Sequence, residues 1–351
     1  MQNQISIADK LIETHSLSAT EWRALLEHPS NDLAEYLKTN ARAVTDRIFG
    51  RQVYVRGLIE FTNICRKDCY YCGIRKSNPE VKRYRLTEEE IMECCKEGYQ
   101  AGFRTFVLQG GEDGYFSEER LSGLVMAIHR EYSDCAITLS VGEWTKESYQ
   151  KFFDAGAERF LLRQETANEA HYAKLHPNDQ RFSVRMECLK NLKEIGYQTG
   201  CGFLVGSPYQ TLDCMIDDLL FLEQFRPQMV GIGPFLPAKN TPFSNESAGS
   251  SEMTLLLLSA IRLLLPEVLL PATTALGTVR QDGRLQGLLH GANVIMPNLS
   301  PNRVRKLYSL YDNKVSTGAE AAEHLEMLRT ELAKENFTVA MSRGDAPGFA
   351  K

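Results

Sequence analysis

Short apolar runs alternate with longer amphipathic segments along most of this chain, and this alternation constrains the fold more than any other feature. Eight runs read as strands: 53–61, 105–108, 136–141, 159–162, 202–205, 229–232, 269–272 and 292–296. Strands separated by helices favour a parallel sheet, because a parallel pair needs a long crossover. Eight such units in roughly 250 residues predict an α/β fold, a complete (β/α)8 barrel of the TIM type. An open doubly wound sheet is the alternative.

Helical patterns fill the intervals between these runs. The predicted helices cover residues 87–101, 118–132, 146–155, 182–195, 212–225 and 252–265. Gly102, Gly156 and Gly196 follow three of them, as a left-handed helix stop requires. Residues 1–50 also show helical spacing, with Ser30 as a cap. We therefore expect an N-terminal helical extension (1–50), a barrel (51–316), and a C-terminal part (317–351) whose helix, over 319–335, and polar tail pack on the barrel.

Composition narrows the class of function. The 351 residues carry a net charge of −5, which argues against a general nucleic-acid binder or a polybasic membrane binder. The most apolar stretch, 253–276, is broken by Arg262, Pro266, Glu267 and Pro271, so it is a poor membrane span. We see no secretory signal and expect a cytoplasmic location. In that compartment the nine cysteines favour metal ligation or catalysis over disulfides.

Three cysteines form a compact array directly after the first strand. Cys65, Cys69 and Cys72 have C-x3-C-x2-C spacing. Three thiolates on one loop can hold three irons of a cubane and leave the fourth without a protein ligand. Such an open position indicates chemistry rather than electron storage, as in catalytic zinc sites. A zinc site lacking its fourth ligand, or three unrelated cysteines, are the alternatives.

With Tyr71 directly before the third cysteine, this array resembles the radical S-adenosylmethionine (SAM) superfamily. The resemblance implies a [4Fe–4S] cluster whose open iron binds SAM and whose electron cleaves it to a 5′-deoxyadenosyl radical. It also implies that Gly110, Gly111 and Glu112, after the second strand, bind the methionyl amino group. Glu165 would hold the ribose hydroxyls, and Arg185 would meet the carboxylate.

The fourth strand carries charge on one face. Period two places Arg159, Leu161, Arg163 and Glu165 together, and Thr138 shares a face with Ser140 on the third strand. Buried charges need partners, so we expect this face to line a polar, anion-binding barrel interior. The alternative is an internal salt-bridge network such as Arg163 with Glu165.

Glycines recur in the later strands. Gly202 and Gly206 are followed along the chain by Gly231, Ile232 and Gly233. Glycine weakens a strand unless something must come close to its backbone. Contact of adenine with Gly231 and Ile232 is one interpretation, and tight packing inside the barrel is the other.

Five further motifs between residues 163 and 311 resemble the HydE-type maturases of [FeFe]-hydrogenase. They begin at Arg163, Gly231, Pro271, Ala292 and Leu307. The resemblance implies a role in assembling the diiron subcluster of the H-cluster on a small, cysteine-containing iron carbonyl–cyanide substrate. It implies other hydrogenase maturases as possible partners and a reductant such as flavodoxin or ferredoxin, with no nucleic acid and no membrane. The residues that match the family's cavity lining are Thr138, Arg159, Arg163, Thr273, Thr274, Met296, Tyr308 and Tyr311.

One departure from the family bears on the cofactor count. Some members carry three more cysteines near the C-terminus for a second cluster, but here no cysteine follows Cys214. We therefore predict one [4Fe–4S] cluster and SAM, with no second C-terminal cluster. The remaining cysteines lack ligand spacing and suit small core fillers.

Other functions stay open at this stage. A methylornithine synthase-like or a biotin synthase-like enzyme would share the barrel and the cysteine array. Biotin synthase needs further cysteines inside its barrel, and Cys135, Cys188 and Cys201 are candidates. A non-catalytic iron–sulfur scaffold is the alternative of another class. The Gly110-Gly111-Glu112 turn argues against a scaffold, which needs no SAM pocket.

Overall fold

The predicted strands form parallel pairs in the computed structural model, which describes residues 2–315 and 325–349. One six-stranded parallel sheet has the order β2, β3, β4, β5, β6 and β8. Its strands are β2 Gly57–Thr62, β3 Thr105–Gly110, β4 Ala136–Ser140, β5 Ala157–Leu161, β6 Gln198–Cys201 and β8 Met229–Val230. β1 (Gln52–Val55) precedes β2 in the same direction and pairs with β10 (Val294–Ile295).

Beyond the six-stranded sheet, isolated parallel bridges connect the remaining strand segments. Met229 of β8 bridges Leu269, and Pro271 bridges Val294 of β10. Residues 269–271 therefore take the place of the seventh strand, and β10 is the eighth. The α/β fold class is confirmed, and these bridges between the six-stranded sheet and β10 are compatible with a barrel.

The fifth strand begins earlier than the sequence predicts. β6 precedes the predicted range, and β7 (Leu204–Val205) pairs separately with β9 (Gly233–Pro234). Gly202 lies between β6 and β7 with φ of 150°, and a Cβ there would be 2.0 Å from the carbonyl oxygen of Gly231. Close approach of two backbones thus interrupts the strand, and tight packing explains Gly202.

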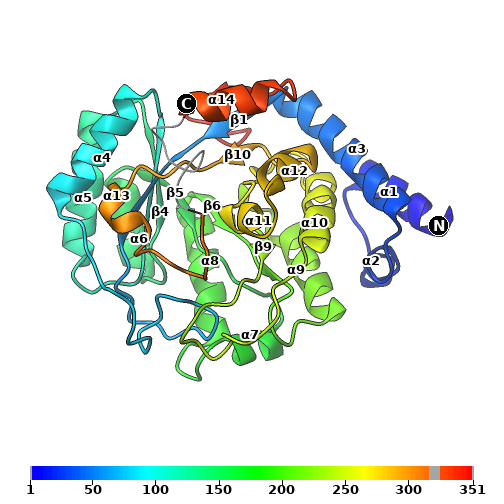
Figure 1. Ribbon diagram of the computed structural model, residues 1–351, viewed down its shortest axis with the longest axis horizontal. Coiled ribbons are helices and arrows are strands. Elements are labelled where there is room, and N and C mark those ends of the chain that lie inside the picture. Colours follow the sequence, from blue (N-terminus) through cyan, green and yellow to red (C-terminus); the bar gives the residue numbers. More distant parts are fainter. Residues whose placement is uncertain (1, 316–324, 350–351) are drawn as a thin grey trace.

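Helices surround the ring (Figure 1). Six match the predicted ranges closely: α4 Glu88–Gln100, α5 Glu118–Glu131, α6 Lys146–Asp154, α8 Phe182–Ile195, α9 Leu212–Phe225 and α10 Ser251–Leu264. Gly102, Gly156 and Gly196 have φ of 97°, 116° and 103°, so the predicted left-handed stops are confirmed. Shorter helices that the sequence analysis missed are α7 Glu169–Leu175, α11 Thr274–Val279, α12 Gly283–Leu289 and α13 Asn302–Arg305.

The N-terminal residues form a helical arm at one side of the barrel (Figure 1). It consists of α1 Gln2–Thr14, α2 Ala19–Leu26 and α3 Asn31–Phe49. The Ser30 side chain caps α3 by accepting from the Leu33 N–H, as predicted. α3 packs along α10, and Arg42 Nη1 donates to the Leu288 carbonyl at 2.8 Å.

The inside of the barrel is polar. Glu60, Thr105, Thr138 and Arg159 are all buried, and the register of β4 and β5 places Thr138 beside Arg159. The alternate residues of the strands pack outward against the helices in the main hydrophobic core. The prediction that Arg159 and Thr138 face the interior agrees with this arrangement.

The C-terminal residues contribute a strand that the sequence analysis did not predict. α14 (Leu325–Ala333) covers part of the predicted helix, whose first residues lie outside the described residues. β11 (Thr338–Ala340) then pairs in parallel with β1. Residues 343–346, here called the closing segment, follow and lie across the amino ends of the barrel strands. Figure 1 shows α14 beside β1 and β10.

Polar contacts hold the closing segment in place. Arg159 Nη2 donates to Asp345 Oδ1 at 2.6 Å and to the Arg343 carbonyl at 2.8 Å. Thr105 Oγ1 donates to the same carbonyl at 2.7 Å, and Gln198 Nε2 donates to Asp345 Oδ1 at 2.8 Å. The amino end of the barrel is therefore closed by a segment far away in the sequence.

None of the helices within residues 2–315 and 325–349 has the length and apolar character that a membrane span needs.

Candidate active site

The cysteine loop follows β2 and is tied down by hydrogen bonds at its base. The Asn63 side-chain amide donates to the carbonyls of Lys82, at 3.0 Å, and Leu307, at 2.8 Å. The Arg83 guanidinium donates to the carbonyls of Asn63, at 2.7 Å, and Ile74, at 2.8 Å. The loop thus has a fixed position at the carboxyl ends of the strands, where barrel enzymes form their active sites.

Hydrogen-bond donors point at two of the three predicted ligand sulfurs. The Glu112 N–H is 3.4 Å from Cys65 Sγ, and Gln180 Nε2 is 3.2 Å from Cys69 Sγ. Both cysteines are partly exposed free thiols, as is Cys72. Donors in these positions stabilise sulfur that carries negative charge, as the thiolates of an iron–sulfur cluster do.

Burial shifts the pKa values of two of these thiols. Burial raises the pKa of Cys69 to about 11. Burial, with the nearby Cys69 and Cys65, raises the pKa of Cys72 well above its usual value. Such thiols become thiolates at neutral pH when a metal replaces the proton.

Three thiols on one loop are a donor set that fits a [4Fe–4S] cluster, because each thiolate of a cubane binds a different iron. Across the described parts of the chain, no three His, Cys, Asp or Glu side chains gather closely enough to hold a single metal ion.

Gly110 and Gly111 make room for the cysteine loop. A Cβ at Gly111 would lie 2.3 Å from the Ile64 carbonyl oxygen and 2.8 Å from Cys65 Cβ. A Cβ at Gly110 would be 2.8 Å from Thr62 Cγ2. Both glycines therefore let the end of β3 pack against the loop, which is a structural reason for the pair that the sequence did not show.

Alternating charges connect the cysteine loop to the next strands. Arg66 Nε donates to Glu112 at 2.9 Å, and the Glu143 N–H donates to Glu112 Oε1 at 3.1 Å. Glu143 is itself paired with Lys67 and, at 2.7 Å, with Arg185. Burial acts to raise the pKa of Glu143, but Arg185 and Lys67 outweigh it, so its pKa is lowered and it is ionised.

Sequence analysis missed Glu143, although a signal was present. Gly142-Glu143 follows β4 as Gly111-Glu112 follows β3. Gly142 has φ of 78°, and a Cβ there would lie 2.3 Å from the Glu112 carboxylate. Two consecutive strands thus end in a glycine and a glutamate that meet. Arg185, the predicted partner of the SAM carboxylate, lies beside them and is bound to Glu143 and to the Arg163 carbonyl, at 2.5 Å.

Tyr71 is oriented by a histidine that sequence analysis also missed. The Tyr71 hydroxyl is 3.2 Å from His176 Nε2, and His176 Nδ1 is 3.0 Å from the Tyr172 carbonyl. Because a carbonyl only accepts, Nδ1 carries the hydrogen and Nε2 accepts from Tyr71. Burial lowers the pKa of His176 to about 3, so the imidazole is neutral. No motif in the sequence marks His176.

Glu165 follows β5 in an uncommon backbone conformation. Its φ is 67°, and its N–H donates to the Gly202 carbonyl at 3.0 Å. The neighbouring loop is held by buried Asp218 of α9, whose Oδ1 accepts from the Ala167 N–H at 2.7 Å and from Gln164 Nε2 at 3.2 Å. A non-glycine residue keeps positive φ when its surroundings fix it, and such residues cluster at functional sites.

A cavity of ≈ 130 Å³ opens beside the cysteine loop. Its lining comprises Tyr71, Cys72, Arg163, Leu204, Gly233, Pro234, Phe235, Leu236, Thr273, Ala275, Leu310 and Tyr311. The predicted substrate residues Arg163, Thr273 and Tyr311 are thus brought together with Cys72. Thr273 precedes α11, and Thr274 is its first residue.

Several polar atoms at this cavity have no partner within the described structure. Arg163 Nε and Nη2, Glu165 Oε2 and Thr273 Oγ1 are buried and make no hydrogen bond. Arg163 and Glu165 approach to 3.1 Å, so the predicted ion pair exists without hydrogen-bond geometry. Buried polar atoms are nearly always satisfied, so the two that lack any partner, Arg163 Nε and Thr273 Oγ1, indicate a polar ligand in the cavity that both residues line.

The structure separates the other predicted substrate residues from this cavity lining. Arg159 is fully buried and bound to Asp345 of the closing segment. Met296 packs against a small apolar cluster with Met229 and Leu269. Thr138 and Tyr308 are buried, and Thr138 Oγ1 has no hydrogen-bond partner among the described residues. Gly231 and Ile232 are also buried, but neither lines this cavity.

Glu60 is a further interior carboxylate that the sequence analysis missed. It forms an ion pair with Lys314 and accepts from Asn298 Nδ2 at 2.8 Å. The sequence signal for Glu60 was a single glutamate on one of the two alternating faces of the first predicted strand. The pair joins β2 to the segment that carries Tyr308 and Tyr311.

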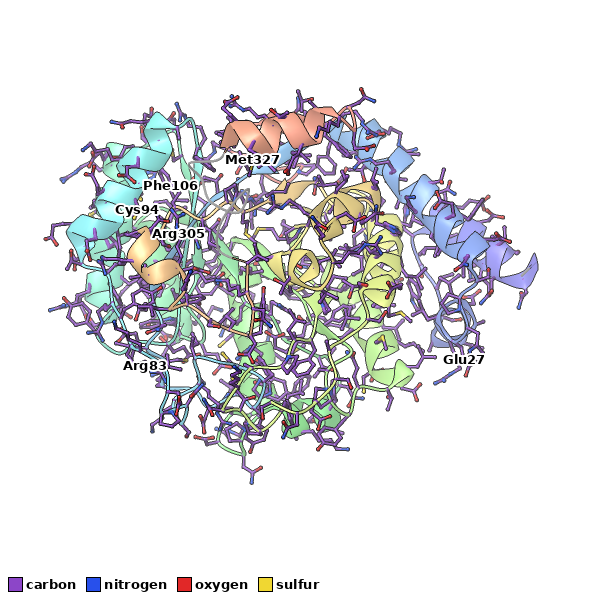
Figure 2. The ribbon with its side chains drawn as sticks, in the orientation of Figure 1. Glu27, Arg83, Cys94, Phe106, Arg305 and Met327 are labelled. Atoms are coloured by element: carbon purple, nitrogen blue, oxygen red, sulfur yellow. The ribbon has the colours of Figure 1, made fainter. Side chains whose placement is uncertain are left out.

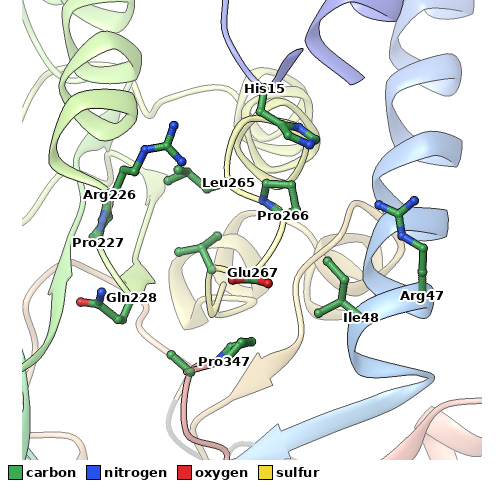
Figure 3. A pocket seen from close by; sticks show the side chains of 12 residues that line it. His15, Arg47, Ile48, Arg226, Pro227, Gln228, Leu265, Pro266, Glu267 and Pro347 are labelled. Atoms are coloured by element: carbon green, nitrogen blue, oxygen red, sulfur yellow. The ribbon is translucent and has the colours of Figure 1, made fainter. Parts of the chain in front are cut away.

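A larger cavity, of ≈ 570 Å³, lies at the other end of the barrel (Figure 3). His15, Arg47, Arg226 and Glu267 are among its lining residues, and none of the nine cysteines is. Figure 2 shows Arg83, beside the cysteine loop, far from Met327 of α14. The chemistry of the side chains, rather than cavity size, therefore selects the carboxyl end as the active site.

The remaining cysteines are buried, as expected for core fillers. Cys135 and Cys201 belong to the main hydrophobic core, and Cys188 of α8 packs there too. Burial raises the pKa of Cys135 to about 12 and also raises that of Cys201. These thiols are protonated at neutral pH, and the described structure does not bring them together as metal ligands.

Known proteins resemble this chain at the level of both sequence and fold. A profile of the radical SAM superfamily matches residues 59–222, which include the cysteine loop and Glu165. The [FeFe] hydrogenase maturase subunit HydE of Thermotoga maritima is 47% identical over 81% of this chain and 84% of that protein. The 3-methylornithine synthase of Methanosarcina barkeri is 33% identical over 88% of this chain and 87% of that protein.

A solved structure of methylornithine synthase (PylB) has the same fold. It aligns with a TM-score of 0.84 and 30% identity over 95% of this chain and 97% of that one. Sequence similarity to HydE is higher than to methylornithine synthase over a comparable share of the chain. The chain therefore belongs to the HydE family of the radical SAM superfamily.

Proposed function

We propose that this chain acts in [FeFe]-hydrogenase maturation, as HydE does, with one [4Fe–4S] cluster on Cys65, Cys69 and Cys72. The observation that carries the proposal is the 47% identity to HydE over more than four fifths of both chains. The arrangement of the cysteine loop supports it, because the loop offers three thiols with donors aimed at their sulfurs. When bound, the cluster supplies the electron that cleaves SAM reductively to methionine and a 5′-deoxyadenosyl radical.

Residues around the loop would bind and orient SAM. We propose Tyr71, Gly110, Gly111, Glu112, Glu165, Arg185, Gly231 and Ile232 for this role. Glu165 Oε2, which is ion-paired with Arg163 at 3.1 Å but accepts no hydrogen bond in the described structure, suits a ribose hydroxyl. The carboxyl groups of Glu112 and Glu143 suit an ammonium group. Arg185 can accept a carboxylate only by sharing its guanidinium with Glu143, to which it is bound.

The substrate would occupy the cavity beside Cys72 and extend toward the barrel interior. We propose a small, cysteine-containing iron carbonyl–cyanide complex. Arg163 Nε and Thr273 Oγ1, which make no hydrogen bond in the described structure, suit carboxylate, cyanide and carbonyl groups. Thr274, Tyr311, Thr138, Tyr308 and Met296 complete the proposed set. We leave Arg159 out, because its guanidinium is bound to the closing segment.

A single cluster accounts for the cysteines. No cysteine follows Cys214 in the sequence, and the six outside the loop are buried. We therefore propose that anaerobic reconstitution loads about four irons per chain, as one cubane requires. About eight irons would contradict the single-cluster proposal.

Two variants test where the cluster binds and whether it cleaves SAM. Cys69→Ala should abolish iron loading and the formation of 5′-deoxyadenosine with dithionite and SAM. Cys201→Ala is the matched control, since it removes a buried cysteine away from the loop and should retain both. Wild-type protein that loads iron but yields no 5′-deoxyadenosine would overturn the enzymatic proposal.

A genetic experiment tests the role in maturation. Deleting the gene in its host should abolish [FeFe]-hydrogenase activity, and the wild-type gene, but not Cys69→Ala, should restore it. Normal hydrogenase activity after deletion would overturn the maturase assignment. Other hydrogenase maturases are the proposed partners in this context.

A further inference from the structure

Tyr172 is a buried tyrosine whose hydroxyl has no partner. It lies on α7 and is 1% exposed, and its hydroxyl makes no hydrogen bond with any residue that the structure describes. A phenylalanine would fill the same space without burying an unpaired polar atom. Because buried hydroxyls are nearly always paired, this one indicates a ligand.

Neighbouring rings hold the Tyr172 ring in one position. It stacks on the His176 ring, with centroids 3.9 Å apart and planes at 22°, and Phe182 packs against it with 5.5 Å between centroids. Tyr172 and His176 are four residues apart, so they share one side of the helix. This packing fixes the place at which the hydroxyl can donate.

The end of α7 is attached to the cysteine loop. The Tyr70 N–H donates to the Leu175 carbonyl at 2.9 Å, and the Tyr71 hydroxyl donates to His176 Nε2 at 3.2 Å. Tyr172 is therefore held, through the last turn of its helix, against the loop that carries the three cysteines.

Arg185 is close to the Tyr172 hydroxyl. Burial raises the pKa of Tyr172 above its usual value, and the nearby Arg185 guanidinium offsets this rise only in part. The hydroxyl therefore keeps its hydrogen at neutral pH and can act as a donor.

The Arg185 guanidinium also has a donor left for a ligand. Its Nε donates to Glu143 Oε1 at 2.7 Å and its Nη1 to the Arg163 carbonyl at 2.5 Å, but its Nη2 makes no hydrogen bond with any described residue. The ion-pair network to which it belongs has three basic and two acidic side chains: Arg66, Lys67, Arg185, Glu112 and Glu143. An anionic group therefore suits the position beside Arg185 and Tyr172.

We propose that Tyr172 is a SAM-binding residue whose hydroxyl donates a hydrogen bond to the SAM carboxylate, which it holds together with Arg185. The inference rests on the proposed function, because it concerns the SAM site of the same chain. Two donors match the two oxygens of a carboxylate, and hydrogen bonds to a charged acceptor are the stronger kind.

The chemistry of the neighbours selects the carboxylate among the polar groups of SAM. A guanidinium only donates and repels an ammonium group, so a group that binds beside Arg185 is an acceptor. The carboxylate is the one anionic group of SAM. The ammonium group and the ribose hydroxyls suit the carboxyl groups of Glu112, Glu143 and Glu165 instead.

The experiment compares two variants that each lose only a hydroxyl. Tyr172→Phe keeps the ring that stacks on His176. Tyr197→Phe is the matched control, because Tyr197 is also 1% exposed but its hydroxyl donates to the Tyr149 carbonyl at 2.7 Å. Tyr197 precedes β6, at the amino end of the barrel. Each full chain is loaded with its cluster and kept oxidised, so that SAM binds without being cleaved.

Equilibrium dialysis measures the binding of SAM and of decarboxylated SAM, an analogue that lacks only the carboxylate. Tyr172→Phe should raise the dissociation constant of SAM at least about tenfold, as expected for the loss of one hydrogen bond to a charged group. The same variant should bind decarboxylated SAM as tightly as wild type does. Tyr197→Phe should bind both molecules like wild type.

Two measurements without SAM separate ligand binding from a structural role. Tyr172→Phe removes a hydroxyl without a partner, so its thermal unfolding midpoint should equal or exceed that of wild type. Tyr197→Phe removes a hydrogen bond and should unfold at a lower temperature. The midpoint potential of the cluster in Tyr172→Phe should equal that of wild type.

The contrary outcomes are distinct. Equal SAM affinity in Tyr172→Phe and wild type would overturn the inference, and so would an equal loss of affinity for SAM and for decarboxylated SAM. A changed cluster potential without SAM would also overturn it, because the hydroxyl would then donate to a cluster sulfur. Wild-type protein that loads no cluster, or loads one and binds no SAM, would instead overturn the proposed function and this inference with it.

Discussion

Gln180 shows how one residue can couple the surface of this protein to its reactive centre. The side chain is buried, and its amide contacts both Cys69 Sγ and the backbone of the cysteine loop. Hydrogen bonds to cluster sulfurs stabilise the more negative, reduced state and so raise the reduction potential. Gln180 lies between α7 and α8, so its role depends on where that connection passes the loop.

We predict that Gln180→Leu lowers the midpoint potential of the cluster. The expected shift is about 40 mV, which corresponds to one hydrogen bond of about 1 kcal/mol in a one-electron couple. A redox titration followed by EPR spectroscopy measures it, with iron content checked in parallel. Gln150→Leu is the control, because Gln150 bonds Asp154 on the exposed side of α6. An unchanged potential with full iron content would show that the amide has no electronic effect.

Asp218 is a second residue that acts on the site from a distance. It is completely buried on α9 and holds the loop that presents Glu165. Burial raises the pKa of Asp218 well above its usual value, and Gln164 and the Ala167 N–H offset this only in part. The fold therefore favours the protonated form of this carboxyl group.

The raised pKa of Asp218 sets the sign of a stability experiment. A group whose pKa is higher in the folded state stabilises fully below its unfolded pKa, near 3.9, and this contribution is lost as pH rises toward the folded value. Asp218→Asn keeps the accepting oxygen without an ionisable proton. We expect its stability, relative to wild type, to increase with pH above about 4 in urea unfolding.

Asp218→Ala serves as the contrast to Asp218→Asn. It leaves the Ala167 N–H and the Gln164 amide unpaired, so it should cost about 1–3 kcal/mol. It should also weaken SAM binding by releasing Glu165. Equal stabilities of the Asn and Ala variants at neutral pH would contradict the assignment.

At the scale of elements, the closing segment stabilises the barrel through a buried ion pair. Arg159 of β5 is completely buried, and Asp345 is bound at once by Arg159, Arg343 and Gln198. Burial acts to raise the pKa of Asp345, but these three partners outweigh it, so the pKa lies below its usual range. The carboxylate is thus ionised in the folded protein.

We predict that Asp345→Ala costs about 3–5 kcal/mol at neutral pH, because it leaves Arg159 buried without its partner. A lowered folded pKa gives stability above the unfolded pKa, so the difference from wild type should narrow as pH falls below about 4. Urea unfolding across this range measures both effects. Asp134→Ala, which breaks an exposed pair with Arg104, should cost less than about 1 kcal/mol. Equal costs for the two variants would contradict the buried role of Asp345.

At the scale of the whole molecule, the two ends of the barrel have different tasks. The carboxyl end holds the cysteine loop and the cavity with unpartnered donors. The amino end is covered by β11 and the closing segment, which come from the last residues of the described chain. Closing one end restricts solvent access to the polar interior from that side.

Truncation tests how far the barrel depends on this cover. A chain that stops after Asn336 loses β11, buried Phe337 and the partner of Arg159, so it should lose at least about 5 kcal/mol, much of a typical folding free energy. Thermal unfolding followed by near-UV circular dichroism measures the loss. A chain that stops after Pro347 keeps these contacts and should unfold like wild type. Equal unfolding of both truncated chains would contradict the role of the C-terminal strand.

The sequence by itself determined features that depend on neighbours along the chain. Period-two and helical patterns located six helices and the strands apart from the fifth and the C-terminal β11, and glycines after three of the helices marked their ends. The spacing of Cys65, Cys69 and Cys72 identified the cysteine loop and the superfamily. These signals are local, because strand alternation, helix capping and ligand spacing act over a few residues.

The tertiary structure alone decided which groups meet. Arg159 reads as a substrate residue in the sequence, but its partner is Asp345, 186 positions away. His176 and Gln180 carry no motif, and Glu143 is marked only by the glycine before it, yet the fold places each against the cysteine loop or its tyrosine. A buried charge takes whichever partner barrel closure brings to it, and that choice depends on contacts between distant segments that no local pattern encodes.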